Sequence, residues 1–247
     1  IISCGRKSVI PSIYLKNTSN KKVINIHIQD PKVDLNHFDF VVAPEHDAID
    51  NQNVISTKGA IHYLTENEIN ENKDYLSSYI KKDDRKIWTL IMGGPTKYYD
   101  YSTKNMKHIF TSLYKLLKKH DFQLVVIPSM RTPVNSIHYA REFFDENHTI
   151  IMDVNKKAYL SALAIAENII VTCDSSSMIS EAALTGKPIY IASILPKKND
   201  KRFQRFRNLF RELNIIRNLG EDLENWNYQK LDETNRVANI IKQKIKP

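Results

Sequence analysis

Three segments of the sequence place glycines, hydroxyl groups and charged side chains directly after an apolar run. The first is Gly93-Gly94, which follows the apolar residues 86–92 and precedes an amphipathic stretch. Two glycines at the carboxyl end of a strand let the backbone turn tightly and let its N–H groups approach a phosphate, helped by the dipole of the next helix. A plain tight turn explains the pair equally well, because the segment is neither GxGxxG nor a Walker P-loop.

The second segment, PSMRTP, follows the apolar run 122–127 and contains Ser129, Arg131 and Thr132. The Arg131 guanidinium can hold a phosphate with two hydrogen bonds, and a parallel sheet binds ligands at the carboxyl ends of its strands. Thr132 followed by Pro133 is also an ordinary helix start, with proline at the first helical position. The two interpretations are compatible.

The third segment, VTCDSSSMISEA at residues 171–182, leads from an apolar stretch through small hydroxyl residues into a helix. Free N–H groups and hydroxyls at a helix start suit a diphosphate, and Glu181 can accept hydrogen bonds from ribose hydroxyls. The structural alternative makes the serines helix caps and Glu181 a solvated residue. We favour ligand binding because three such loops meet at one sheet edge. The candidate donor-binding residues are Gly93, Gly94, Ser129, Arg131, Thr132, Asp174, Ser175, Ser176, Ser177, Ser180 and Glu181.

A cluster of titratable residues, Glu45, His46 and Asp47, follows the apolar run 38–43. A histidine beside carboxylates is a workable general base, so these three are the candidate catalytic residues. A polar turn is the structural alternative, because residues that are adjacent in sequence need not converge in space.

The elements that must position these residues follow from hydrophobic patterning. Short runs rich in Ile, Val and Phe alternate with longer amphipathic stretches, which is typical of α/β proteins, and the absence of apolar/polar alternation predicts parallel strands covered on both faces. Strands are expected at residues 1–4, 22–28, 38–43, 53–56, 86–92, 122–127, 149–152, 168–172 and 188–192. Helices are expected at residues 7–17, 66–80, 103–119, 133–146, 156–166, 176–185, 201–213 and 232–245.

Composition and charge narrow the function classes. The 247 residues are 42% hydrophobic and 26% charged, which predicts a folded protein, and no apolar run reaches the length of a membrane span. Residues 197–217 carry eight basic and two acidic side chains, but Phe203, Phe206 and Phe210 recur there at helical spacing as a buried face. Nucleic acid is therefore not an expected partner. Cys4 and Cys173 are expected to be buried free thiols, consistent with a cytoplasmic protein.

A longer set of motifs resembles the mitochondrial-fission Elm-type family of bacterial and plant proteins. The resemblance covers nearly the whole chain. It rests on QDP at 29–31, FDFVVAPEHD at 38–47, GAIH at 59–62, IMGGPTKYY at 91–99, PSMRTP at 128–133, VTCDSSSMISEA at 171–182, TGKP at 185–188, KRFQRF at 201–206 and LDET at 231–234.

The resemblance implies a GT-B-like fold of two Rossmann-like lobes with parallel sheets. A polar stretch before residue 86 predicts the boundary, which gives an acceptor-side lobe at residues 1–83 and a nucleotide-sugar lobe at 84–247. The C-terminal helix is expected to cross back to the first lobe. Relatives are expected to begin with a further strand, glycine loop and helix, so the first lobe is expected to be truncated at its N-terminus.

The resulting hypothesis is a metal-independent glycosyltransferase. It would move a sugar from a nucleoside diphosphate donor to a cell-envelope glycan or lipid, with no cofactor beyond the nucleotide-sugar substrate. The basic segment predicts attraction to anionic lipid and a peripheral position at the inner face of the membrane. Two alternatives stay open: a noncatalytic adaptor that recruits a partner protein, as plant relatives do in mitochondrial fission, and a sugar-nucleotide epimerase.

Overall fold

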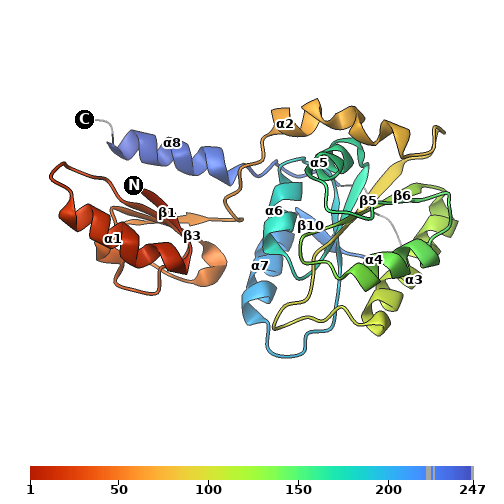
Figure 1. Ribbon diagram of the computed structural model, residues 1–247, viewed down its shortest axis with the longest axis horizontal. Helices are drawn as coiled ribbons and strands as arrows, with labels where there is room; N and C mark the ends of the chain where they lie inside the picture. The colour runs from red at the N-terminus through yellow and green to blue at the C-terminus, as the bar shows by residue number, and fades with distance from the viewer. Residues whose placement is uncertain (221–223, 225, 246–247) are drawn as a thin grey trace. The chain divides into compact units, whose positions relative to one another are not determined.

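The structure, a computed structural model, describes residues 1–220, 224 and 226–245 (Figure 1). Contacts divide the chain into two compact units. The first unit comprises Ile1–Tyr63 together with the C-terminal segment from Asp232, and the second unit comprises Leu64–Leu231. Both are α/β units built on parallel sheets, as the sequence predicts.

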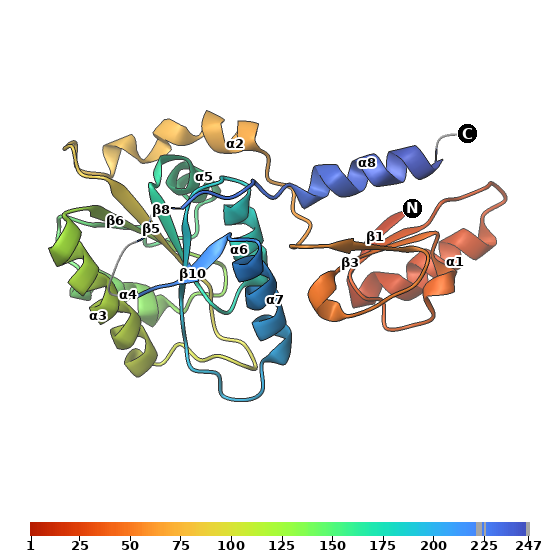
Figure 2. The same cartoon turned by 180° about the vertical axis from the view of Figure 1, so that it is seen from behind.

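The described part of the first unit contains a four-stranded parallel sheet of order β1-β2-β3-β4. Successive residues of a strand point to opposite faces. Val41 and Ala43 of β3 accordingly pack with Val9 of α1, whereas Val42 packs with Val237 of α8. The two helices lie on opposite faces of this sheet (Figures 1 and 2). The elements are β1 Ile2–Cys4, α1 Val9–Thr18, β2 Ile26–Ile28, β3 Phe40–Pro44, β4 Val54–Thr57 and α8 Glu233–Ile245, with 3-10 turns η1 Arg6–Ser8, η2 Leu35–His37 and η3 Glu45–Asp47.

Helix α8 is tied to the first unit by polar contacts as well as by its apolar face. The backbone N–H of Lys58 donates to the buried carboxylate of Glu233 at 2.8 Å, and the Thr234 hydroxyl donates to the carbonyl of His62 at 2.7 Å. The C-terminal helix therefore packs with the first unit, in agreement with its expected return to that lobe, although the predicted range 84–247 counted it with the second lobe.

The boundary expected after residue 83 is wrong by about twenty residues, because the chain changes unit at residue 64. Residues 64–83 form α2 Glu66–Glu71 and the 3-10 segment η4 Lys73–Ser78, where a single helix was expected. The backbone N–H of the fully buried Leu76 donates to the Ser161 hydroxyl at 3.1 Å, and that hydroxyl donates to the carbonyl of Lys73 at 2.6 Å. The segment is polar because it covers the second unit from outside and buries few side chains.

The described part of the second unit holds a six-stranded parallel sheet of order β10-β9-β8-β5-β6-β7. Strand β10 was not predicted, since Arg217 and Asn218 interrupt its short apolar run. The elements are β5 Ile87–Met92, α3 Thr103–His120, β6 Gln123–Pro128, α4 Val134–Phe143, β7 Thr149–Ile150, α5 Lys156–Ile165, β8 Asn168–Thr172, α6 Ser176–Ala183, β9 Ile189–Ala192, α7 Lys201–Glu212 and β10 Ile216–Asn218.

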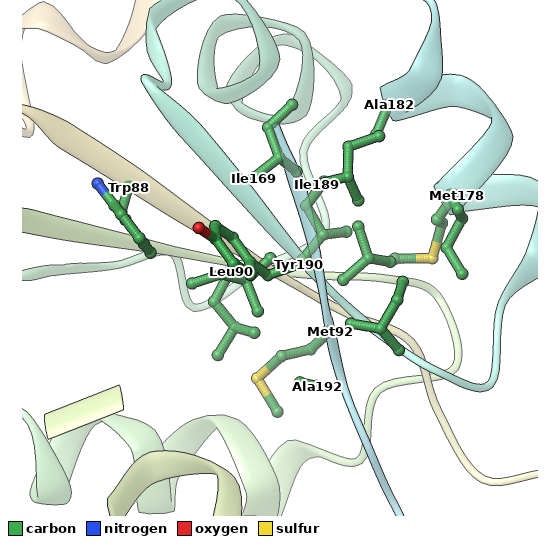
Figure 3. Packing of buried hydrophobic residues seen from close by; sticks show 14 of the residues in the cluster. Trp88, Leu90, Met92, Ile169, Met178, Ala182, Ile189, Tyr190 and Ala192 are labelled. Atoms are coloured by element: carbon green, nitrogen blue, oxygen red, sulfur yellow. The ribbon is translucent and has the colours of Figure 1, made fainter. Parts of the chain in front are cut away.

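Side chains of the second unit's core pack across strands β5, β8 and β9. Trp88 of β5 stacks on Tyr190 of β9 with ring centroids 5.6 Å apart. Figure 3 shows Ala182 of α6 beside Ile169 and Ile189, which are register partners in β8 and β9. Of the two cysteines, Cys173 is buried as expected, but Cys4 is exposed because β1 is the edge strand of its sheet.

The strand order reverses at β5. From β5 the chain proceeds outward to β6 and β7 and then returns to β8, which pairs with the other side of β5. Leu90 is consequently in register with Val126 on one side and with Ile170 on the other. Open parallel sheets bind ligands beyond the carboxyl ends of strands at such a reversal. The three predicted loops follow β5, β6 and β8.

Candidate functional site

The three loops meet at the carboxylate of Asp174, which follows β8 and is 2% exposed. It accepts hydrogen bonds from the backbone N–H of Gly94 at 3.0 Å, from the hydroxyl of Tyr101 at 2.6 Å and from the guanidinium of Arg131 at 3.2 Å. A buried carboxylate requires such partners. Asp174 therefore joins the loops to one another, and its oxygens are engaged within the protein.

The two glycines permit the close approach of these loops. A Cβ atom on Gly93 would lie 2.2 Å from a carboxylate oxygen of Asp174, and one on Gly94 would lie 2.0 Å from the carbonyl oxygen of Arg131. The N–H of Gly93 donates to the Thr172 hydroxyl at 2.8 Å. Both glycine N–H groups are thus used inside the protein, which differs from the expectation that they face a phosphate.

Ser129 and Thr132 link the second loop to the first. The Ser129 hydroxyl donates to the carbonyl of Gly93 at 3.0 Å, and the Thr132 hydroxyl donates to the carbonyl of Met92 at 2.8 Å. Thr132 does not cap α4, whose N-cap position is Pro133 without a side-chain cap. The Arg131 side chain is 44% exposed, and it is therefore the cation of this loop that solvent or a ligand can reach.

Helix α6 begins beside the junction, by which we mean the meeting of the three loops at Asp174. Ser175 is its N-cap, and the backbone N–H of Met178 donates to the Ser175 hydroxyl at 3.4 Å. Ser176 is half-buried and Ser177 is exposed in the first turn, where the N–H groups of a helix have no intrahelical acceptor. Ser180 is different, since it is buried and its hydroxyl donates to the carbonyl of Ser176 at 2.8 Å.

Glu181 lies on the next turn of α6, partly buried against α5. The hydroxyl of Tyr159 donates to one carboxylate oxygen at 2.6 Å. Burial raises the pKa of Glu181, and the hydrogen bond from Tyr159 opposes that rise by favouring the ionised form. Glu181 is therefore oriented by a neighbouring helix. The structural alternative, in which Glu181 is a solvated residue, does not describe it.

The candidate catalytic residues lie in the first unit, in the turn η3 directly after β3. His46 is 6% exposed, and its Nε2 atom is 3.8 Å from a carboxylate oxygen of Asp47. Glu45 instead forms an ion pair with Lys58 at 3.1 Å. The turn thus brings His46 and Asp47 together and directs Glu45 elsewhere.

A cavity of about 460 Å³ opens next to the junction in the second unit. Its walls come from the start of α3, the segment after β9 and the start of α7, and Cys173, the residue before Asp174, lines it. Arg207 of α7 pairs with the buried Asp200 at 2.9 Å and donates to the hydroxyl of Tyr99 at 2.9 Å. Burial would raise the pKa of Asp200, but hydrogen bonds from Tyr99 and Arg207 bring it below its usual value.

Sequence reasoning missed the residues that hold this site together. Tyr101 and Thr172 bind the loops around Asp174, and Tyr159 orients Glu181. Tyr101 and Tyr159 lie outside the motifs, and Thr172 lies within VTCDSSSMISEA but was not singled out. Arg207 stood out only as part of a basic run, although its side chain is 12% exposed. The available signal was Asp200, one of two acids in that run, since an acid flanked by bases is a candidate ion-pair partner.

Among the residues that the structure describes, no helix is long and apolar enough to cross a membrane. Within the same residues, no three of the His, Cys, Asp and Glu side chains gather into a group that could hold a metal ion.

Comparison with known sequences identifies one family. The profile of the family described as "Mitochondrial fission ELM1" matches residues 1–245. The "Mitochondrial fission protein ELM1" of Arabidopsis thaliana is 24% identical over 273 residues, which covers 99% of this chain and 63% of the plant protein. The chain therefore spans less than two thirds of that relative's length.

Comparison with solved structures identifies the fold. The UDP-GlcNAc 2-epimerase of Methanocaldococcus jannaschii, solved in complex with UDP-GlcNAc and UDP, matches with a TM-score of 0.55 and 13% identity over 98% of this chain and 75% of that one. MurG of Acinetobacter baumannii matches with a TM-score of 0.50 and 13% identity over 98% and 70% of the two chains. These likenesses confirm the predicted GT-B-like fold, and at such identity they show the fold alone.

Proposed function

The chain belongs to the Mitochondrial fission ELM1 family, and from its GT-B-like fold and the geometry of the second unit we propose that it is a glycosyltransferase that uses a nucleoside diphosphate sugar. The acceptor is a cell-envelope glycan or lipid. One observation carries the proposal: the loops after β5, β6 and β8 are joined at Asp174, at the reversal of strand order. The UDP-GlcNAc and UDP bound to a fold neighbour support the choice of ligand.

In this proposal the diphosphate lies against Arg131 and the first turn of α6. The Arg131 guanidinium keeps exposed donors beside its contact with Asp174, and Ser176 and Ser177 supply N–H and hydroxyl groups. Because the N–H groups of Gly93 and Gly94 are occupied, the glycines contribute by holding the loops close together. Glu181 accepts hydrogen bonds from the ribose with its carboxylate, which Tyr159 orients.

The proposed transfer step exchanges one bond of the sugar for another. A hydroxyl oxygen of the acceptor attacks the anomeric carbon of the sugar, the bond from that carbon to the diphosphate oxygen breaks, and the nucleoside diphosphate leaves with the bond electrons. Donors fixed around the diphosphate stabilise the charge that develops there. We assign the acceptor's proton to His46, with Asp47 as its neighbour.

Calorimetric titration with a panel of nucleoside diphosphates and their sugars tests the donor site. Glu181→Ala should weaken nucleoside diphosphate binding by about 1.5–3 kcal/mol, the range for hydrogen bonds to a charged group. Glu142→Ala, on the exposed surface of α4, is the matched control and should leave binding unchanged. Absence of binding by every nucleotide in the panel would refute the donor site.

Two alternatives can be separated from the transferase. An epimerase would convert the nucleotide sugar to its epimer without an acceptor, whereas a transferase releases nucleoside diphosphate only when an acceptor is supplied. A noncatalytic adaptor is favoured by a different observation, an apolar groove of about 360 Å³ between α8 and the sheet of the first unit. Ile26 and Ile28 of β2 line the groove together with Ile241. Capture of a partner protein by a variant that binds no nucleotide would support the adaptor.

We also propose a peripheral position at the cytoplasmic face of a membrane. Helix α7 buries Phe206 and Phe210 and exposes Lys201, Arg205 and Arg211, so its outer face is basic. Such a face is attracted to anionic lipid, and salt screens the attraction. Equal co-sedimentation with neutral and anionic vesicles would exclude this binding mode.

A further inference from the structure

The cavity of the second unit is lined by basic side chains that have no role in the proposed nucleotide site. Lys104 and His108 of α3 line it one turn apart, so they share one face of the helix. Arg207 of α7 also lines the cavity. The acid found in the described lining is Asp200.

The negative charge of Asp200 is compensated within the protein. Its carboxylate accepts hydrogen bonds from the Tyr99 hydroxyl, from the Arg207 guanidinium at 2.9 Å and from the side-chain amide of Gln204 at 2.6 Å. With Asp200 paired to Arg207, the positive charge of Lys104 remains without an acidic counterpart in the described lining, and His108 lies beside it. The start of α3 adds the positive end of its helix dipole.

The rest of the lining suits a sugar ring. Ser193 offers a hydroxyl, and Gln204 offers an amide oxygen, since its nitrogen is the donor to Asp200. Ile194, Leu195 and Pro196 provide an apolar surface for the C–H face of the ring. A volume of about 460 Å³ lies within the range of about 300–1,000 Å³ for small-molecule sites.

The position of the cavity connects it to the donor. Cys173 lines it and is followed at once by Asp174, where the three loops meet, and Tyr99 belongs to the loop that begins with Gly93. We propose that this cavity holds the sugar of the donor and that this sugar carries a carboxylate, as a hexuronate does. The inference rests on the proposed function. Because the diphosphate is assigned to Arg131 and α6, Lys104 and His108 bind the sugar's own acid group.

Matched pairs of sugar nucleotides test this inference on the full chain. The panel of nucleoside diphosphates first identifies the base, and calorimetry then compares a hexose with a hexuronate on that base, UDP-glucose with UDP-glucuronate in the case of uridine. The hexuronate should bind about tenfold more tightly, the ratio expected for one charge-assisted hydrogen bond. In the double variant Lys104→Gln, His108→Gln that preference should fall to about twofold or less.

The control is Lys107→Gln, an exposed lysine of the same helix that does not line the cavity, and it should keep the preference. The NMR signals of the His108 ring add a second readout, since binding of the hexuronate should shift them further than binding of the hexose does. Equal affinity for hexose and hexuronate would overturn the acidic-sugar inference and leave the proposed function intact. Failure of every nucleoside diphosphate to bind would overturn both.

Discussion

The carboxylate of Asp174 accepts a hydrogen bond from the backbone N–H of Gly94 across 80 residues of sequence. The contact exists because β5 and β8 are neighbours in the sheet, with Ile91 in register with Val171. It joins two loops that are far apart in sequence at one edge of the sheet. The same carboxylate also binds Arg131 from the loop after β6, so a single buried acid organises the candidate donor site.

Gly94→Ala should destabilise the second unit by about 1–3 kcal/mol, the usual cost of overpacking. The added Cβ would lie 2.0 Å from the backbone oxygen of Arg131, which cannot rotate away. Gly94 does not have a left-handed backbone conformation, so the cost is steric alone. Urea unfolding measures it, with Gly220→Ala as the control because nothing lies within 4 Å of a Cβ at that position. Equal effects of the two substitutions would contradict the close approach of the loops.

Leu76→Ala should destabilise the second unit by about 2–5 kcal/mol, as expected for a cavity made in a core. Leu76 is fully buried in a cluster with Val125 and Ala162, although it lies in a polar stretch of sequence. Leu195→Ala serves as the control, because Leu195 is 81% exposed. Tryptophan fluorescence reports on this unit, which contains Trp88 and Trp226. An unfolding midpoint unchanged by Leu76→Ala would place residues 73–78 outside the core.

Tyr159→Phe should make nucleoside diphosphate binding more sensitive to acid. Burial already raises the pKa of Glu181, and the variant removes the hydrogen bond that opposes this rise, so the pKa should increase further. The carboxylate is the form that accepts from ribose, hence affinity should begin to fall at a higher pH in the variant as pH decreases. Calorimetry at several pH values measures the shift. Tyr114→Phe, on the outer surface of α3, is the control and should follow the wild-type pH profile. If the pH profile of Tyr159→Phe were also identical to that of the wild type, Tyr159 would have no part in ligand binding.

The first unit should lose stability in mild acid because of His27. Its ring is fully buried, its Nδ1 atom lies 2.8 Å from the Ser3 hydroxyl, and burial lowers its pKa below 6.5. As the pH falls through about 6.5, His27 is protonated in the unfolded chain but not in the folded chain. The contribution of His27 to the free energy of unfolding is therefore complete above that pH and is lost as the pH decreases towards the folded pKa.

His27→Gln should remove this part of the pH dependence, which amounts to about 1.4 kcal/mol for each unit of pKa shift. Urea unfolding followed by circular dichroism between about pH 7.5 and 5.5 compares the slopes. His138→Gln, at an exposed position of α4, should retain the wild-type slope. A wild-type slope in His27→Gln would assign the acid sensitivity to another group.

The sequence by itself determined the alternation of buried strands and amphipathic helices, because each apolar run is a local property of the chain. It also determined which loops end at the carboxyl side of strands, and therefore that Gly93, Arg131 and Asp174 are candidates for one site. The start of α6 was predictable for the same reason. A serine such as Ser175 before an apolar run caps a helix whatever the fold around it.

Only the tertiary structure decided which residues touch. Strand order is not a local property, so the hydrogen bond from Gly94 to Asp174 and the pairing of Arg207 with Asp200 could not be inferred from spacing. Helix α8 joins the first unit although the whole second unit separates it from β4 in sequence, and only the family resemblance, not the spacing of residues, had indicated this. Packing across the sheet also turned the Gly93 N–H group towards the Thr172 hydroxyl and the Gly94 N–H group towards the carboxylate of Asp174, because a buried carboxylate needs donors.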